Sequence, residues 1–443
     1  MKMTLAVRFV LAAMLFVSVP AASFAGTYYV SPAGSDANPG TQLQPLKTFH
    51  RAAKMSRPGD TFIFEDGIYN ETQYPWIEQT NGLATASSPV VFKARNKHRA
   101  VLVFQNLQHE KILIRQHHVT LQDFEITQNV RGGVNDHMVF AYNGSANVTI
   151  IGNKIHNVTT DCVKGNRTSN LLVQDNLCYD SQNEGIDVLN SYDVTVVGNE
   201  VWNVGRSGIL LKGGGRDFKV FNNYVHASSP MVFGIVLGGQ SCTGCTYDFS
   251  TSGYEAYNSV AYNNVIVSNP AGMIQQGLTL MGAADSAFIN NIVIGAQTAI
   301  VLTAAPGTSY GWAWNPMVKN PFIVNNIAQN CTSRATSISG VQGTMTHDYN
   351  TYFNCAGAPT QAHGLTSDPM IVDPLKDWHL SAGSPSAGSG MVVAPRTGFQ
   401  GAQIDVSRDG AGVQRTAPWD RGVYAGGAMT APLAPPTNLR IVR

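Results

Sequence analysis

Four polar residues on two neighbouring stretches of the sequence have the types and spacing to bind a cation. Asp161 lies in D-C-V-K-G, and N-E-G-I-D further along the chain contains Asn183, Glu184 and Asp187. Carboxylates held close together repel each other, so their pKa values rise unless a cation lies between them. Calcium takes several oxygen ligands, and carboxylates with an amide carbonyl suit it. The set predicts a catalytic Ca²⁺ site, with a purely structural ion or ion pairs to Lys164 as the alternatives.

Lys212 ends the stretch S-G-I-L-L-K and is followed by three glycines. A lysine acts as a base only when its pKa falls, and a nearby cation lowers it. With a metal ion polarising a uronate carboxylate, such a base could remove the C5 proton and begin a β-elimination. Arg216 could hold a substrate carboxylate, and Lys164 could supply further positive charge. The alternative is an ordinary solvated lysine at a strand end.

Two tryptophans are candidates for contact with a sugar. Trp312 and Trp314 lie in A-A-P-G-T-S-Y-G-W-A-W-N-P, one of two long insertions in the second half of the chain. Insertions of this length are usually functional or disordered. The indole rings could stack on sugar faces or pack the insertion onto the body of the protein, and the sequence leaves both possibilities open.

A repeat supplies the elements that position these residues. Short strand-like stretches joined by a single asparagine recur along the chain, with the asparagines at Asn153, Asn176, Asn199, Asn223, Asn264, Asn291 and Asn326. The first three intervals are 23, 23 and 24 residues. Stacked coils bring equivalent residues to about 4.8 Å, where asparagine amides can hydrogen-bond from coil to coil. The pattern predicts an all-β, right-handed parallel β-helix with an Asn ladder.

The 23-residue interval also predicts which side chains share a column. Adding 23 takes Asp161 to Glu184 and Lys164 to Asp187. Alternate apolar residues in both later strands should face the interior, which turns Asp187 and Lys212 outward. The candidate ligands and the candidate base are therefore expected on one outer face of three consecutive coils.

The remaining segments define the expected domain organisation. Residues 1–25 combine basic residues, an apolar core and S-F-A, the pattern of a Sec-type signal peptide, so we expect a secreted or periplasmic protein. Residues 26–426 are expected to form the β-helix domain. A short N-terminal capping helix is expected within about 40–60, and closing strands in D-W-H-L-S and P-W-D-R-G-V-Y. Residues 427–443 are expected to be a flexible, Pro-rich tail.

Composition restricts the partners. The formal net charge is +1 with 13% charged residues, so no nucleic-acid partner is expected, and no later apolar run predicts a membrane span. We expect a monomer. The six cysteines suggest local disulfides, Cys162 with Cys178, Cys242 with Cys245 and Cys331 with Cys355. The second pair could also be half of a zinc site, but no second pair of ligands has zinc spacing.

The stretches D-C-V-K-G, N-E-G-I-D and G-I-L-L-K-G-G resemble, in this order, the pectate lyases of polysaccharide lyase family nine. The resemblance implies a parallel β-helix, an acidic polysaccharide substrate, calcium bound by Asp161, Asn183, Glu184 and Asp187, and Lys212 as the base. Asn183 and Glu184 replace two aspartates of the family pattern, and the lysine stretch is one residue longer before the lysine.

Three alternatives to a pectate lyase remain. One is a lyase for alginate or another acidic exopolysaccharide, because a fold does not determine a substrate. Another is a glycoside hydrolase that uses paired carboxylates without a metal. The third is a non-catalytic carbohydrate-binding β-helix protein.

Overall fold

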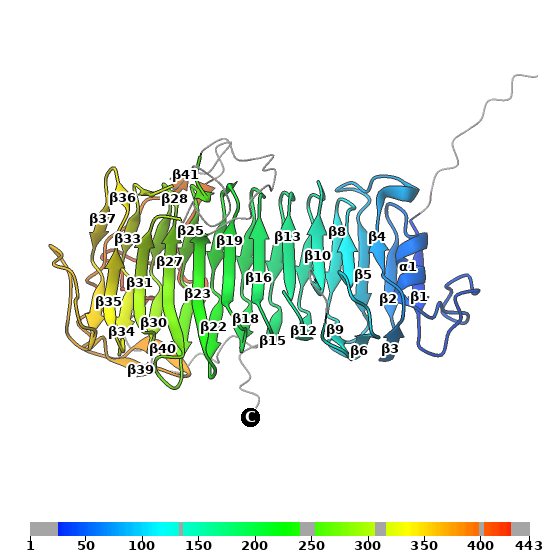
Figure 1. The fold of residues 1–443 in the computed structure, drawn as a ribbon, viewed down its shortest axis with the longest axis horizontal. Coiled ribbons are helices and arrows are strands. Elements are labelled where there is room, and N and C mark those ends of the chain that lie inside the picture. The colour runs from blue at the N-terminus through cyan, green and yellow to red at the C-terminus, as the bar shows by residue number, and fades with distance from the viewer. Residues whose placement is uncertain (1–24, 133–135, 240–252, 306–315, 398–402, 427–443) are drawn as a thin grey trace, which may run out of the picture.

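The computed structural model describes residues 25–132, 136–239, 253–305, 316–397 and 403–426. These residues form a parallel β-helix whose strands line up in long sheets along one axis (Figure 1). The three main sheets have 12, 11 and 10 strands, and a fourth, short sheet has five. Ten successive coils contribute one strand to each main sheet, with β1 before them and β37 and β38 after them, so the predicted fold class is confirmed.

The strands of the four sheets have the following bounds. The 12-stranded sheet contains β1 (Thr27–Val30), β2 (Thr61–Phe64), β5 (Val90–Ala94), β8 (Val119–Gln122), β11 (Thr149–Ile151), β14 (Leu172–Gln174), β17 (Thr195–Val197), β21 (Lys219–Phe221), β25 (Val260–Tyr262), β29 (Ala287–Ile289), β33 (Phe322–Val324) and β37 (Thr346–Asp348). The 11-stranded sheet contains β3 (Gly67–Glu71), β6 (Ala100–Phe104), β9 (Glu125–Gln128), β12 (Lys154–Val158), β15 (Leu177–Ser181), β18 (Glu200–Trp202), β22 (Tyr224–Ala227), β26 (Val265–Ser268), β30 (Ile292–Ile294), β34 (Ile327–Gln329) and β38 (Thr351–Phe353). The 10-stranded sheet contains β4 (Trp76–Ile77), β7 (Ile112–Ile114), β10 (Val139–Tyr142), β13 (Val163–Asn166), β16 (Glu184–Leu189), β19 (Ser207–Lys212), β23 (Met231–Gly238), β27 (Ile274–Met281), β31 (Thr298–Thr303) and β35 (Arg334–Ile338). The five-stranded sheet contains β20 (Gly215–Arg216), β24 (Ala256–Tyr257), β28 (Ala283–Ala284), β32 (Val318–Lys319) and β36 (Val341–Gln342).

The predicted register holds across the coils that carry the candidate residues. Lys164 of β13 pairs with Asp187 of β16, and Leu189 of β16 pairs with Lys212 of β19. Glu184 pairs with Ser207, the first residue of β19. The inward residues of these strands are fully buried aliphatic side chains, which form one continuous core along the axis.

The asparagine ladder is present at all seven predicted positions and continues to Asn350. The side-chain oxygen of each asparagine accepts the backbone N–H of the preceding ladder position, as from Asn176 N to Asn199 Oδ1 at 3.0 Å. The ladder begins with Phe124 N donating to Asn153 and ends with Asn350 N donating to Gln361 Oε1. It therefore satisfies buried backbone groups at one turn of every coil along its length.

The N-terminal end is covered by the helix α1 (Phe49–Met55), inside the predicted capping region. The Thr48 side chain caps the helix by accepting the Arg51 N–H at 3.0 Å. Phe49 is buried and its ring lies 5.1 Å from that of Phe64 and 5.0 Å from that of Phe92, both on the first coils. The helix thus closes the open end of the core, as a solenoid requires.

The C-terminal residues do not close the opposite end but lie along the side of the β-helix (Figure 1). The hairpin β39 (Ile371–Asp373) and β40 (Asp377–Leu380) buries Trp378 against outward residues of β26, β30 and β34. D-W-H-L is a strand as predicted, whereas P-W-D-R-G-V-Y has only an isolated bridge at Trp419, so that prediction is wrong. The physical reason is that the outer faces of these later coils are apolar and need a cover.

Two of the three predicted disulfides lie in the described residues and are confirmed, Cys162–Cys178 and Cys331–Cys355. The third pair, Cys242 and Cys245, lies outside them, as do the predicted signal peptide, apart from its last residue, and the C-terminal tail. In the part of the chain that the structure describes, no helix has the length and hydropathy needed to cross a membrane. A short antiparallel pair, β41 (Arg396–Thr397) with β42 (Gln403–Ile404), and a 3-10 turn (Gln79–Asn81) complete the elements.

Candidate functional site

Three carboxylates meet on the outer face of the 10-stranded sheet. One oxygen each from Asp161, Glu184 and Asp187 lies within 4.8 Å of the others. The three residues are almost completely buried, with exposed fractions of 0%, 1% and 2%. The register prediction that brought them together is therefore correct, but the expected solvent exposure is not present.

A break in strand alternation puts Glu184 and Asp187 on the same face. Residues three apart in a regular strand point to opposite sides. Position 185 faces the core, because a Cβ built on Gly185 would lie 2.4 Å from Val201 Cγ1, which is buried there. Ile186 also faces the core, so two consecutive inward positions return the next residue to the outer face. Cys162 and Val163 repeat this arrangement one coil earlier.

Asp161 is the most strongly stabilised anion of the cluster. Its Oδ1 accepts hydrogen bonds from Glu184 N at 3.2 Å and from Asn183 Nδ2 at 3.3 Å. Its Oδ2 lies 2.9 Å from His137 Nδ1 and 3.2 Å from Lys164 Nζ. Burial opposes ionisation, but the charge of Lys164 and the contact with His137 hold the pKa of Asp161 below its usual range.

Glu184 is in the opposite electrostatic situation. Burial, with the neighbouring charges of Asp187 and Asp161, raises the pKa of Glu184 to about 9. Arg206 Nη1 lies 3.7 Å from Glu184 Oε1, but the arginine side chain is 48% exposed and gives little compensation. Without an added cation, the carboxyl group of Glu184 therefore carries a proton at neutral pH.

Lys164 lies between the carboxylates of two coils. Its Nζ contacts Asp187 Oδ2 and Asp161 Oδ2. Burial disfavours the charged amine, but these two carboxylates raise the pKa of Lys164 above its usual range. The side chain, predicted to contact substrate, is thus engaged by the cluster and is 15% exposed.

Lys212 lies at the edge of the cluster, with its Nζ 3.9 Å from Asp187 Oδ2 and its side chain 13% exposed. Arg216 belongs to the five-stranded sheet, where its guanidinium lies 5.4 Å from the centre of the Tyr192 ring and 3.9 Å from Asp217 Oδ2. Trp312 and Trp314 lie outside the described residues.

Two buried carboxylate oxygens in the cluster suit a cation. Glu184 Oε2 and Asp187 Oδ1 accept no hydrogen bond from any described residue. A cation bound there would take the place of the Glu184 proton and would coordinate the free oxygen of Asp187. The three candidate ligands, Asp161, Glu184 and Asp187, offer only oxygen atoms. Oxygen ligands favour a hard cation such as Ca²⁺ over a transition metal. The residues present therefore fit the ion that the sequence predicts.

One residue of the cluster, His137, was not predicted from the sequence. His137 precedes Asp161 by 24 residues, in the register that pairs Val139 with Val163, and extends the column by one coil. Ser207 extends it in the other direction, and its buried Oγ has no hydrogen-bond partner among the described residues. The interval between His137 and Asp161 is 24 residues, so a fixed interval of 23 did not indicate His137, whereas it leads from Glu184 to Ser207.

Residues 28–193 match the model of the Pel9A-like right-handed β-helix region. This segment includes the three carboxylates but ends before Lys212. The curated relative YwoF of Bacillus subtilis (strain 168), an uncharacterised protein, is 27% identical over 149 residues, which are 31% of this chain and 30% of that protein. The chain therefore matches less than a third of the relative's length.

Solved structures share the fold over most of the chain. XylC in complex with xylose has a TM-score of 0.57 at 11% identity, covering 90% of this chain and 98% of XylC. Pectate lyase Pel9A has a TM-score of 0.52 at 15% identity, covering 90% and 96%. A glycoside hydrolase has a TM-score of 0.52 at 10% identity, covering 74% and 96%. The comparisons therefore show a right-handed parallel β-helix fold, in which residues 28–193 are similar to the Pel9A-like β-helix region.

Proposed function

We propose that this protein is a polysaccharide lyase that cleaves a uronic-acid polymer by β-elimination, with Ca²⁺ at the acidic cluster and Lys212 as the general base. The observation that carries the proposal is the convergence of three buried carboxylates, two of them with unpaired oxygens, beside a lysine on the adjacent coil. The Pel9A-like match over the segment that carries the carboxylates supports this class of enzyme.

Each residue has a definite part in this proposal. Asp161, Glu184 and Asp187 hold the ion, with Asn183 at the edge of the set. Ca²⁺ held by these residues would supply Lewis-acid stabilisation of the negative charge on the substrate carboxylate next to C5. Lys212 removes the C5 proton at its Nζ, the C4–C5 double bond forms as the C4–O glycosidic bond breaks, and the leaving oxygen takes a proton from solvent. Lys164 neutralises part of the negative charge, which holds the Asp187 and Asp161 side chains in position and keeps Asp161 ionised.

The outer face of the same sheet offers a path for the polymer. Asn166 and Tyr142 continue the column of Lys212 and Leu189 toward the N-terminus, one residue per coil. Coils repeat at about 4.8 Å, so Tyr142 lies about 14 Å from Lys212 along the axis. On the next coil, the guanidinium of Arg115 lies 5.8 Å from the centre of the Tyr142 ring. A cation beside an aromatic ring suits a uronate residue, so we propose that the chain lies parallel to the helix axis.

A second candidate function is favoured by the contrast between two adjacent carboxyl groups. Asp161 has a lowered pKa, whereas the pKa of Glu184 is raised to about 9. An ionised and a protonated carboxyl group at short separation are the pair that a retaining glycoside hydrolase uses. In that case Glu184 is the general acid, Asp161 the nucleophile, and no metal is needed.

Product analysis with and without a chelator separates the two functions. Purified protein is incubated with pectate, alginate and neutral xylan, and both ultraviolet absorbance and new reducing ends are followed. A lyase produces a conjugated unsaturated uronate that absorbs, and chelation abolishes its formation. Reducing ends without absorbance, unaffected by the chelator, would instead support the hydrolase.

Export fits the same proposal. A polysaccharide is degraded outside the cell, and the two disulfides require an oxidising compartment. We propose that residues 1–25 direct secretion, that residues 26–426 act as one monomeric domain, and that residues 427–443 form a tail without a part in catalysis.

A further inference from the structure

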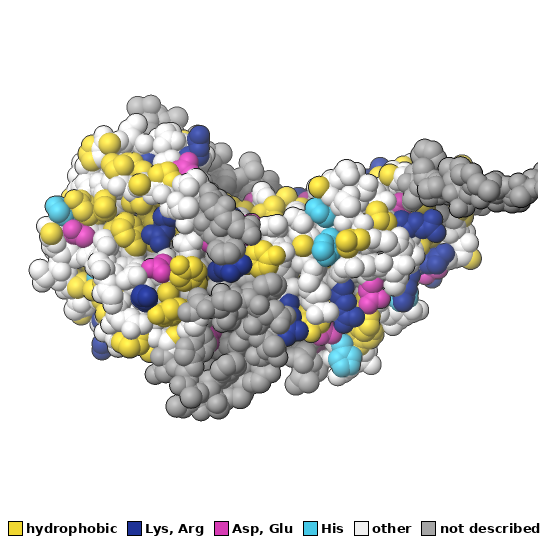
Figure 2. Space-filling model, turned by 90° about the horizontal axis from the view of Figure 1, so that it is seen from above, with side chains coloured by type: hydrophobic (Ala, Val, Ile, Leu, Met, Phe, Trp, Pro, Cys, Tyr) yellow, Lys and Arg dark blue, Asp and Glu magenta, His cyan; other side chains and the backbone are white. Residues whose placement is uncertain are grey.

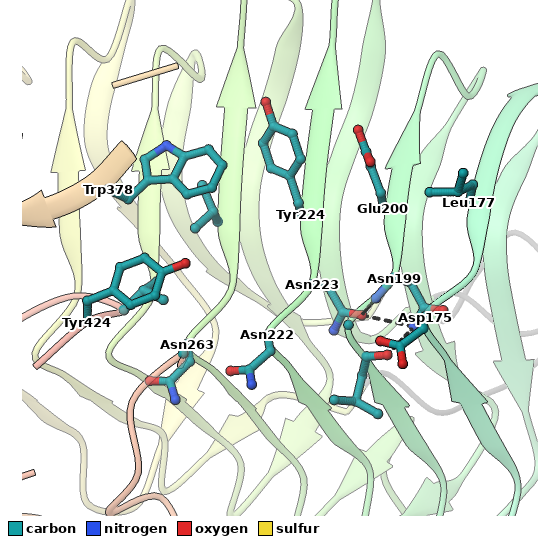
Figure 3. Close-up of a pocket in the computed structure, with 15 residues that line it drawn as sticks. Asp175, Leu177, Asn199, Glu200, Asn222, Asn223, Tyr224, Asn263, Trp378 and Tyr424 are labelled. Carbon is teal, nitrogen blue, oxygen red and sulfur yellow. Dashed lines mark hydrogen bonds between the residues drawn. The ribbon is translucent and has the colours of Figure 1, made fainter. Parts of the chain in front are cut away.

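A groove of about 200 Å³ lies at the turn between the 12-stranded and 11-stranded sheets, away from the sheet that carries the acidic cluster. Figure 3 shows its walls, where side chains of four consecutive coils meet two aromatic residues of the C-terminal segment. The polar and aromatic groups around it are Asp175, Glu200, Asn222, Tyr224, Trp378 and Tyr424.

The groove arises from the backbone conformation next to the asparagine ladder. The residue before each of these ladder asparagines has a positive φ, 52° at Asp175, 66° at Gly198 and 55° at Asn222. This conformation favours Gly, Asn and Asp. Gly198 has no side chain, and an added Cβ would lie 2.2 Å from Asp175 Oδ1. The Asp175 carboxylate therefore lies against Gly198, and Asp175, Gly198 and Asn222 together form one side of the groove.

Further along the column of residues that precede the ladder asparagines, the C-terminal segment covers the side chains of Asn263 and Asn325. Asn263 Nδ2 donates to Arg408 O at 2.8 Å, and Asn325 exchanges two hydrogen bonds of 2.8 Å with the backbone of Met391. At Asn222 the buried Oδ1 has no hydrogen-bond partner among the described residues. The groove thus begins where the segment stops covering the column, and the Asn222 amide Nδ2, which is not buried, makes no hydrogen bond with a described residue there.

The side chains that line the groove indicate which kind of ligand could bind there. Tyr224, Trp378 and Tyr424 supply aromatic surface, and Asp175 with Glu200 supplies two carboxylates. None of the described residues that line the groove is Lys, Arg or His, so an anionic ligand would be repelled. Amphipathic aromatic rings with a few fixed polar groups are typical of sites for small polar ligands.

We propose that this groove is a second, non-catalytic carbohydrate site that binds a neutral pyranose. Its volume is below the ~300 Å³ of the smallest common drug-sized pockets, which suits a single sugar ring. The Asn222 amide Nδ2 donates to a hydroxyl oxygen of the ring, the ring hydroxyl groups donate to Asp175, and the C–H face of the ring contacts the aromatic wall. The site would hold neutral residues of a polysaccharide while the acidic cluster acts on uronate, and it stands independently of the proposed reaction.

Titration followed by NMR, with xylose, glucose, galactose and galacturonate as probes, tests this inference on the full chain. We expect millimolar binding of at least one neutral sugar and weaker binding of galacturonate. Asn222→Gly keeps the positive φ and removes the amide, and should weaken binding about tenfold, the value of one good hydrogen bond. Asn143→Gly, at an exposed asparagine with φ 54°, is the matched control and should bind like the parent protein.

Tyr424→Phe provides a second variant that keeps the ring stacked on His379, 4.1 Å away, and removes only the hydroxyl group. It should weaken sugar binding without changing the fold. Lys212→Ala should bind neutral sugars as the parent does, which separates this site from the reaction. Absence of neutral-sugar binding, equal affinity for galacturonate, or unchanged binding in both groove variants would overturn the proposal.

Discussion

Gly185→Ala is expected to destabilise the protein and to disperse the acidic cluster. An alanine Cβ would lie 2.4 Å from Val201 Cγ1 and 2.6 Å from the backbone oxygen of Gly208 on the next coil. Normal contacts between carbon atoms are about 3.5–4.0 Å, so both neighbours would have to move by about 1 Å. The carbonyl group belongs to the backbone of the 10-stranded sheet and cannot rotate away as a side chain can.

Overpacking of a core usually costs about 1–3 kcal/mol, and the backbone contact places this substitution at the upper end, about 3 kcal/mol. Equilibrium urea unfolding followed by circular dichroism measures the loss. Because Gly185 turns Glu184 outward, the same variant should bind Ca²⁺ more weakly. Gly132→Ala is the control, since the nearest atom to its added Cβ is 4.0 Å away, and it should stay within about 0.5 kcal/mol of the parent. A Gly185→Ala protein as stable as this control would refute the inward placement of residue 185.

Two further predictions concern stability. Asn199→Ala removes the acceptor of the buried Asn176 N–H and the donor to Val173 O, at 3.0 and 2.9 Å, so it should cost about 2–5 kcal/mol in urea unfolding; a loss below about 1 kcal/mol would mean that the ladder does not hold the coils together. Burial lowers the pKa of His347 to about 4, where it contacts Tyr352 Oη at 2.7 Å. The unfolded chain therefore binds this proton first, and unfolding free energy should fall by up to about 3 kcal/mol from pH 6.5 to pH 4. His347→Gln should remove this part of the pH dependence of the unfolding free energy. An unchanged pH dependence in the variant would contradict the lowered pKa of His347.

The spacing of the repeat was enough to predict which coils carry the residues of the candidate site. The recurring asparagines set the register, and the register put Asp161, Glu184, Asp187 and Lys212 on neighbouring coils. These are contacts between adjacent repeats, where sequence distance maps directly to space. On the described surface seen from above, acidic and basic side chains are interspersed, and neither forms a continuous band (Figure 2). This distribution agrees with the formal net charge of +1.

Contacts that do not repeat could not be predicted in this way. Strict alternation places Glu184 and Asp187 on opposite faces, and only the inward break at Gly185 resolves this. Lys164 was expected to contact substrate, but two carboxylates hold it. The packing of Trp419 on the later coils joins residues more than 100 positions apart, which no periodic pattern indicates.

The rate of absorbance increase on a polyuronate in the presence of Ca²⁺, measured for Lys212→Ala against the parent protein, tests the central claim most directly. General base catalysis contributes about 10²–10⁴-fold, so the variant should lose at least a hundredfold in rate while keeping its fold. Lys219→Ala, which alters a lysine paired with Asp193 on the 12-stranded sheet, should retain the parent rate. Equal rates for Lys212→Ala and the parent would show that Lys212 is not the base, and that the account of this site as a lyase centre is wrong.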